Sequence, residues 1–232
     1  MNELDLEKLK YPIGKFSVPS SYSQEYIADK IEEIATFPEK LKLETINLSN
    51  EQLDTPYRPG GWTVRQVIHH CAESHMNCFI RIKWALTENN PVIKAYDEVL
   101  WSELPDNLKM PIEPTLTLLD GLHSRIVYIM KNLSENDLEK SFIHPENNSE
   151  YKIKQLIALY SWHGNHHLAH ITSLKKYKTV YLENYSNYDN GIYIWLFQIT
   201  VFFFFAHLFV DGILDVLAHK RQLLHPCAVT HP

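Results

Sequence analysis

The chain has 232 residues, 45% of them hydrophobic, so it is long enough to bury a large core without disulfide bonds. Its net charge of −6 argues against nucleic acid as a partner, because neutralising phosphates requires clustered Lys and Arg side chains. The cysteines Cys71, Cys78 and Cys227 form no CxxC pattern. We expect Cys71 and Cys78 to be small, buried and reduced side chains on one helix.

The N-terminal region has the character of a surface arm. Residues 1–7 are polar and acidic, unlike a secretory signal, which together with reduced cysteines predicts a cytoplasmic protein. Residues 1–22 contain Pro12, Gly14 and Pro19 and show little periodicity. This pattern predicts an extended segment that crosses the surface.

Four stretches with apolar residues at three- to four-residue spacing predict four long helices, and no stretch is rich in strand signals. The expected helices cover residues 23–46, 63–88, 115–133 and 151–177. Pro38 should kink or break the first of them. Thr63 and Gln66 have the spacing of a capping box, with Trp62 before them as a hydrophobic staple. The sequence therefore predicts an all-α protein, a four-helix bundle.

The connection between the second and third expected helices, residues 89–114, is long and contains four prolines. Loops of this length are often functional. Tyr96, Trp101 and Leu104 are expected to hold it against the bundle or to line a pocket. Further along, a short helical turn is expected to begin at Ser134, and residues 142–149 are expected to form a loop.

Residues 161–170, Ser-Trp-His-Gly-Asn-His-His-Leu-Ala-His, contain four histidines. The pairs His163/His167 and His166/His170 are each separated by one helical turn, so each pair projects from one face. At 100° per residue, His163 and His167 lie on the apolar side of the helix and the other pair lies on its flank. Two histidines at this spacing can bind one metal ion, so we take the inward pair as candidate ligands.

A third ligand must come from elsewhere, and the other histidine-rich segment contains His69, His70 and His75. His75 falls within the apolar stripe of its helix and His70 on the polar side, so periodicity leaves the choice of ligand open. Three histidines with one open coordination position are typical of catalytic zinc. The alternative, also open at this point, is that the histidines are ordinary core or surface residues that bind no ion.

Three motifs in this order resemble the YfiT branch of the DinB-like family. They are residues 58–66 (Arg-Pro-Gly-Gly-Trp-Thr-Val-Arg-Gln), 69–77 (His-His-Cys-Ala-Glu-Ser-His-Met-Asn) and 162–167 (Trp-His-Gly-Asn-His-His). The likeness extends over roughly residues 10–177. It implies a four-helix bundle, usually a homodimer, with a divalent metal held by three histidines. It also implies the activity of a metal-dependent hydrolase or of a bacillithiol S-transferase.

The resemblance implies a particular set of site residues. His70 matches the family's ligand on the second helix, and His163 and His167 match the two on the fourth. The latter two coincide with the pair chosen from the helical face, whereas His70 rests on the resemblance alone. The family often has Asp where this chain has Glu73, a carboxylate one methylene longer. Glu73 is the candidate catalytic residue, expected to orient a ligand or a metal-bound water.

Three neutral imidazoles leave the charge of a divalent ion uncompensated, whether the ion is zinc, as expected, or nickel or another transition metal. Such an ion lowers the pKa of bound water towards about 7 and deprotonates a bound thiol. The favoured reaction is transfer of a small, bacillithiol-like thiol to an electrophile. The alternatives are hydrolysis of an amide or ester by metal-bound water, and a metal-binding stress-response module without catalysis. Gly164 after His163 excludes the HExxH motif of metallopeptidases.

Two further predictions concern Arg65 and the C-terminal part. Arg65 is expected either to hold a substrate carboxylate or to be a solvated helix residue. The resemblance ends near residue 178, which predicts a bundle of residues 1–178 and an extension of residues 179–232. The extension contains an uncharged, aromatic-rich stretch that predicts an extra hydrophobic helix at about 191–218. That helix is expected to pack on the bundle or across a dimer, or to be a non-homologous addition; membrane contact is possible but not favoured.

Overall fold

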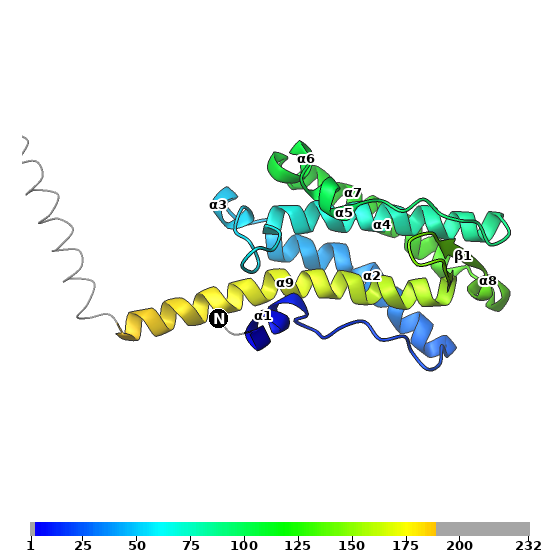
Figure 1. Cartoon of the computed structure of the whole chain (residues 1–232), viewed down its shortest axis with the longest axis horizontal. Coiled ribbons are helices and arrows are strands. Elements are labelled where there is room, and N and C mark those ends of the chain that lie inside the picture. The colour runs from blue at the N-terminus through cyan, green and yellow to red at the C-terminus, as the bar shows by residue number, and fades with distance from the viewer. Residues whose placement is uncertain (1–2, 189–232) are drawn as a thin grey trace, which may run out of the picture. The chain divides into compact units, whose positions relative to one another are not determined.

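The structure is a computed structural model that describes the backbone of residues 3–188 and the side chains of residues 5–174. Four long helices form a bundle (Figure 1), and they are α2 (Gln24–Thr45), α4 (Val64–Thr87), α7 (Glu113–Lys131) and α9 (Ile153–Tyr188). The predicted all-α, four-helix bundle is confirmed. Among the helices in the described part of the chain, none contains a segment long and apolar enough to cross a bilayer.

The chain divides into two compact units, Met1–Lys176 and Tyr177–Pro232, and the first contains the bundle and the site described below. The hydrophobic helix expected at about 191–218 lies outside the described residues, so its existence and placement stay predictions. The proposed boundary at residue 178 falls within α9 and also stays a prediction.

The starts of the bundle helices follow local sequence signals. At the start of α4, the Thr63 hydroxyl accepts from the Gln66 N–H at 3.2 Å, and the Gln66 side-chain carbonyl accepts from the Thr63 N–H at 2.9 Å. This is the predicted capping box. Pro38 was expected to kink or break the first helix; a break is wrong, because α2 continues through Pro38 to Thr45, and the kink stays a prediction. Proline has no N–H, however, so Pro38 cannot donate to the carbonyl of Ile34 one turn earlier.

The connecting segments contain more structure than the sequence indicated. The segment expected to be extended begins with α1 (Glu3–Lys10), and the long connection contains α5 (Glu98–Ser102) and α6 (Pro105–Lys109). The expected loop at 142–149 is instead an antiparallel hairpin of β1 (Ser141–His144) and β2 (Ser149–Lys152). Helices of one or two turns are too short to show a clear 3.6-residue period, which is why the sequence pattern missed them. The remaining short helices are α3 (Asn50–Leu53) and α8 (Glu135–Glu139), the latter capped by Ser134 as predicted.

The buried apolar side chains form two clusters, and each takes residues from all four bundle helices. Members of the first include Ile31, Ile82, Ile126 and Ile157. Members of the second include Leu41, Ile68, Leu119 and Ile171. Cys71 and Cys78 belong to this core as free thiols, as predicted, and burial raises the pKa of both. Apolar packing in both clusters thus holds the four long helices together. This packing fixes the positions of side chains that project between the helices.

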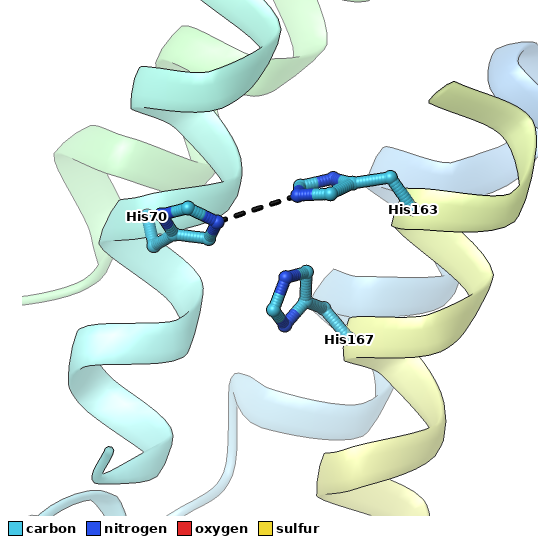
Figure 2. Close-up of side chains that lie close together, drawn as sticks. All are labelled: His70, His163 and His167. Carbon is cyan, nitrogen blue, oxygen red and sulfur yellow. Dashed lines mark hydrogen bonds between the residues drawn. The ribbon is translucent and has the colours of Figure 1, made fainter. Parts of the chain in front are cut away.

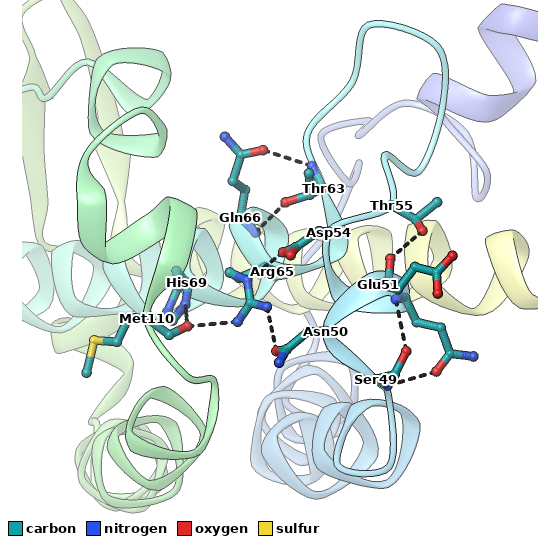
Figure 3. Close-up of polar contacts among 11 residues, drawn as sticks. Ser49, Asn50, Glu51, Asp54, Thr55, Thr63, Arg65, Gln66, His69 and Met110 are labelled. Carbon is teal, nitrogen blue, oxygen red and sulfur yellow. Dashed lines mark hydrogen bonds and ion pairs between the residues drawn. The ribbon is translucent and has the colours of Figure 1, made fainter.

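Arg65 has neither of the roles expected for it. Its side chain is only 4% exposed and donates from Nε to Asp54 at 2.7 Å, from Nη1 to the Met110 carbonyl at 2.9 Å and from Nη2 to Asn50 at 3.0 Å (Figure 3). These bonds connect α3 and the segment after α6 to the first turn of α4. Arg65 therefore positions the start of the helix that carries His70.

We expect Arg65→Met to lower the free energy of unfolding by about 2 kcal/mol, because it removes three hydrogen bonds donated by a buried guanidinium. The Met110 carbonyl keeps a contact with His69 Nε2 at 3.3 Å. This loss of stability is smaller than is usual when one partner of a buried ion pair is removed. The reason is that the Asp54 side chain is 55% exposed and can be hydrated. Urea unfolding measures the effect. Arg125→Met, an exposed arginine on α7, is the control and should change stability by less than about 1 kcal/mol. Equal unfolding midpoints for the two variants would contradict this role.

Candidate metal centre

Three imidazoles from two helices point toward one another inside the bundle. His70 comes from α4, and His163 and His167 come from α9 (Figure 2). One ring nitrogen of each lies within 4.8 Å of the others, and the Nε2 atoms of His70 and His163 are 3.3 Å apart. The structure thus brings together all three residues that the sequence indicated as ligands. The role of each as a ligand remains a proposal.

The donor set fits a divalent cation. Ligand nitrogens at 2.0–2.1 Å from a tetrahedral ion lie about 3.3 Å from each other, so the His70–His163 spacing already suits one ion. A proton shared between two of these nitrogens satisfies only that pair, whereas a cation binds the lone pairs of all three. The distances between the other ring nitrogens can be shortened by small rotations of the side chains, without movement of the helices.

Burial keeps these imidazoles neutral. It lowers the pKa of His70 to about 4, and burial together with the neighbouring imidazoles lowers the pKa values of His163 and His167 well below the ordinary value. A histidine binds a metal ion in its neutral form. At neutral pH these rings are already neutral, so they need not release a proton before they bind a cation. The Nδ1 atoms of His70 and His167 are buried without a hydrogen-bond partner among the described residues.

Two further buried histidines lie behind His163. Its Nδ1 is 3.2 Å from His75 Nε2, and His75 Nδ1 is 2.6 Å from His123 Nε2. Nδ1 of His123 is in turn 2.7 Å from the carbonyl oxygen of Ile34. His75, one of the three candidates for the third ligand, therefore contacts a ligand candidate from behind. His123 was missed by the sequence analysis; the available signal was a single histidine on the apolar face of α7.

The other histidines lie outside this cluster. His69 contacts the Thr115 hydroxyl at 2.7 Å, away from the three converging rings. His166 stacks on Trp162 with ring centroids 4.5 Å apart, and His170 donates from Nε2 to the Lys10 carbonyl at 3.0 Å. The placement of His166 and His170 on the flank of the helix is therefore confirmed.

Glu73 is held away from the three imidazoles. Its Oε1 accepts from Asn107 Nδ2 at 2.6 Å, and its Oε2 is buried without a hydrogen-bond partner among the described residues. Burial raises the pKa of Glu73, partly offset by the Asn107 hydrogen bond. Glu73 is not among the described residues that line the cavities at the cluster. Its catalytic role stays a prediction that this position does not favour.

Two cavities reach the cluster, and they share Trp62, His166 and His167 in their linings. One, of about 350 Å³, also reaches His70 and His163, and Tyr96 and Arg81 are among its other lining residues. The other, of about 510 Å³, has Lys10 and Arg58 as its charged lining residues. Both volumes are typical of small-molecule sites. Tyr96 thus lines a pocket, one of the two roles expected for it.

Trp62 contributes to the site rather than only to the start of α4. Its ring lies 4.7 Å from that of His70 and stacks at 20° over His167, with centroids 6.5 Å apart. The sequence analysis preferred the role of a staple for this residue. The indole lines both cavities beside the candidate ligands, and its role as a staple stays a prediction.

Gly164 allows close packing beside His163. A methyl group at this position would lie 3.0 Å from Cδ2 of Phe37, whose ring packs against His75 and His123 at centroid distances of 5.2 and 5.5 Å. Phe37 is 2% exposed, so its ring is enclosed by the core. The lack of a side chain at residue 164 therefore allows α2 and α9 to pack closely at the site.

We expect Gly164→Ala to lower the free energy of unfolding by roughly 1 kcal/mol. The gain in helix propensity is about 1 kcal/mol, and overpacking of a rigid core costs about 1–3 kcal/mol. Gly121→Ala in α7 is the matched control, because a methyl group there meets nothing within 4 Å. The control should be as stable as the original chain or more so. If urea unfolding shows Gly164→Ala to be equally stabilised, the close contact with Phe37 does not limit packing.

The fold and the site together define a class of protein. It is the four-helix bundle with a candidate metal site in its core, formed here by three imidazoles from two helices. A family model described as the DinB superfamily matches residues 41–171. The chain belongs to this superfamily. The resemblance seen in the sequence motifs is therefore confirmed.

Individual relatives agree with this assignment. A protein of Oceanobacillus iheyensis named "Putative metal-dependent hydrolase" is 54% identical over 169 residues, which cover 73% of this chain and 97% of the relative. A protein of the same description from Bacillus cereus is 52% identical over 171 residues, covering 74% and 98%. The solved structure of YfiT from Bacillus subtilis, described as a probable metal-dependent hydrolase with an unusual four-helix bundle topology, is similar with a TM-score of 0.73 and 42% identity. It covers 74% of this chain and 98% of that one.

Proposed function

We propose that His70, His163 and His167 bind one divalent cation and that the chain is a metal-dependent enzyme. The observation that carries the proposal is the convergence of one nitrogen from each ring to within 4.8 Å across two helices. Three protein ligands leave a tetrahedral ion one position for a reactant. The names of the relatives, which describe metal-dependent hydrolases, support the same class of activity.

Within this class, we propose transfer of a small, bacillithiol-like thiol to an electrophile. A cation at the site supplies Lewis acidity, which favours the thiolate form of a bound thiol. The thiolate sulfur then forms a bond to the electrophilic carbon, the leaving group departs with its electron pair, and the thiol proton passes to solvent. This chemistry needs no carboxylate base, and Glu73 is held by Asn107 instead of facing the imidazoles.

The two cavities support a reaction of two substrates. They meet at Trp62 and His167, so molecules bound in each would approach the cluster from different sides. The larger cavity has the cations Lys10 and Arg58 in its lining and no carboxylate among the described lining residues, which suits an anionic reactant. We place the thiol substrate in one cavity and the electrophile in the other, and we propose the homodimer implied by the family as the working assembly.

The test uses purified, untagged protein loaded with one metal at a time. Conjugation of L-cysteine to 1-chloro-2,4-dinitrobenzene is followed by absorbance, with and without a chelator. We expect a metal-dependent rate that is lost in His163→Ala. A rate equal to that of the chelated protein with every metal would contradict thiol transfer.

Hydrolysis is the second candidate, and the names of the relatives favour it. It is tested with the same preparations on activated esters and anilides. Metal-dependent release of p-nitrophenol or p-nitroaniline without thiol conjugation would replace the transferase proposal by the hydrolase. Tight metal binding with neither activity would instead favour a non-catalytic metal-binding module.

A further inference from the structure

A row of hydrogen bonds runs from the metal centre through all four helices of the bundle. It begins at His163 on α9, continues through His75 on α4 and His123 on α7, and ends at the carbonyl of Ile34 on α2, with separations of 3.2, 2.6 and 2.7 Å. His75 and His123 are each 2% exposed. Water therefore does not compete for the bonds of these two rings, and each of their four nitrogens has one partner among the described residues.

The carbonyl at the end determines the direction of every bond. A carbonyl oxygen only accepts, so Nδ1 of His123 carries its proton, and a neutral imidazole has only one N–H. His123 Nε2 must then accept from His75 Nδ1–H, and His75 Nε2 must accept from His163 Nδ1–H. The proton of His163 is thereby fixed on Nδ1. Its Nε2 then carries the lone pair, and this atom lies 3.3 Å from Nε2 of His70 and 3.5 Å from Oγ of Ser74.

The three rings are neutral, as this argument requires. Burial lowers the pKa of His123 to about 4, and it lowers the pKa of His75 well below the ordinary value, helped by the neighbouring imidazoles. The Ile34 carbonyl and the Asp120 carboxylate favour the charged form of His123, but burial outweighs both, so the ring stays neutral. The row ends at an amide carbonyl, which cannot pass a proton on. It is therefore suited to holding protons in place and not to conducting them.

A feature of α2 explains why the Ile34 carbonyl is available. In an uninterrupted helix this oxygen would accept from the N–H of residue 38, but residue 38 is proline and has no N–H. A buried carbonyl without a donor destabilises the fold. His123 supplies the missing donor from α7. Pro38 and His123 are thus complementary, and together they fix the far end of the row.

We propose that His75 and His123 are positioning residues that hold His163 in the Nδ1–H tautomer, so that its Nε2 is always presented to the cation. The metal-binding half of this inference rests on the proposed function, whereas the tautomer does not. Without the row, His163 would divide its proton between two nitrogens and rotate more freely. Loss of such a partner behind a metal-binding histidine weakens metal binding by about 10–100-fold.

The first measurement is made on the metal-free protein labelled with ¹⁵N at histidine. Long-range ¹H–¹⁵N spectra at pH 7.5 distinguish protonated from unprotonated ring nitrogens. We expect His163, His75 and His123 all to be Nδ1–H tautomers in the original chain, and His163 to be a mixture in His75→Phe. Protonation of His163 on Nε2 in the original chain would overturn the inference, whatever the protein's activity.

The second measurement is zinc affinity, by competition with a chromogenic chelator. His75→Phe keeps a ring but removes both nitrogens, and we expect about 10–100-fold weaker binding. His75→Gln retains one acceptor and one donor and should recover most of the affinity. His69→Phe is the matched control, a buried histidine of the same helix outside the row, and should bind zinc like the original chain. Unchanged affinity in His75→Phe, or equal losses in His75→Phe and His69→Phe, would contradict a positioning role.

These results separate the inference from the proposed function. If the original chain binds no zinc, the proposed function fails, and the tautomer spectra still decide the inference. If His75→Phe does not fold, His123→Gln provides the second variant, because its amide can still donate to the Ile34 carbonyl. In that variant we expect the His163 tautomer to be preserved; a mixture of tautomers in a folded His123→Gln would count against the row as the cause.

Discussion

Replacing His167 by alanine is expected to weaken zinc binding by about 10²–10³-fold. Zinc sites made of four protein ligands have binding free energies of about 10–16 kcal/mol, so each ligand accounts for roughly 2.5–4 kcal/mol. The loss should be similar for His163→Ala and His70→Ala, because the three rings contribute one nitrogen each. Chelator competition on metal-free protein measures the affinities.

The matched control for this prediction is His166→Ala. His166 is adjacent to His167 on α9, but its ring stacks on Trp162 instead of joining the cluster. We expect its zinc affinity to equal that of the original chain. If His166→Ala and His167→Ala lose affinity equally, the ion is not bound by the inward pair. If neither loses affinity, the ion is bound elsewhere on the chain.

Acid is expected to destabilise the metal-free protein steeply between pH 6.5 and pH 4. Burial lowers the pKa of both His70 and His123 from the ordinary 6.5 to about 4. The unfolded chain therefore binds more protons than the folded chain between these values, and stability falls as pH falls. The contribution is fully present above pH 6.5 and is lost as pH falls towards 4. It is on the order of 3 kcal/mol for each of these two buried rings.

Urea unfolding of metal-free protein at pH 7.5, 6.0 and 5.0 tests this dependence. Each such histidine should add about 1.4 kcal/mol per pH unit to the slope between its two pKa values. The variant His123→Gln removes one titrating group and should have a shallower slope by about one proton. A free energy of unfolding that stays constant from pH 7.5 to 5.0 would show that the histidines are not buried in neutral form.

Much of the bundle was predictable because its signals are local. The capping box at Thr63 and Gln66 marked the start of α4, and apolar periodicity marked the long helices. The hairpin of β1 and β2 and the short helices α1, α5 and α6 were not predictable in this way. They are too short for periodicity and depend on packing against the bundle.

The site was predictable in part for the same reason. Because His163 and His167 lie on one helix, their spacing alone placed them on one face. The partner from α4 depended on how two helices pack, so periodicity left His69, His70 and His75 open, and only the resemblance selected His70. The role of Pro38 required the position of His123 on another helix, which no local pattern contains.

The most direct test of a cation bound by three imidazoles with one open position is the zinc X-ray absorption spectrum of the loaded protein. We predict a first shell of three imidazole nitrogens and one exchangeable light atom at about 2.0–2.1 Å. Addition of excess L-cysteine should replace that light atom by one sulfur at about 2.3 Å while the three imidazoles remain. A shell of four or more protein ligands, or one without imidazole scattering, would contradict the account.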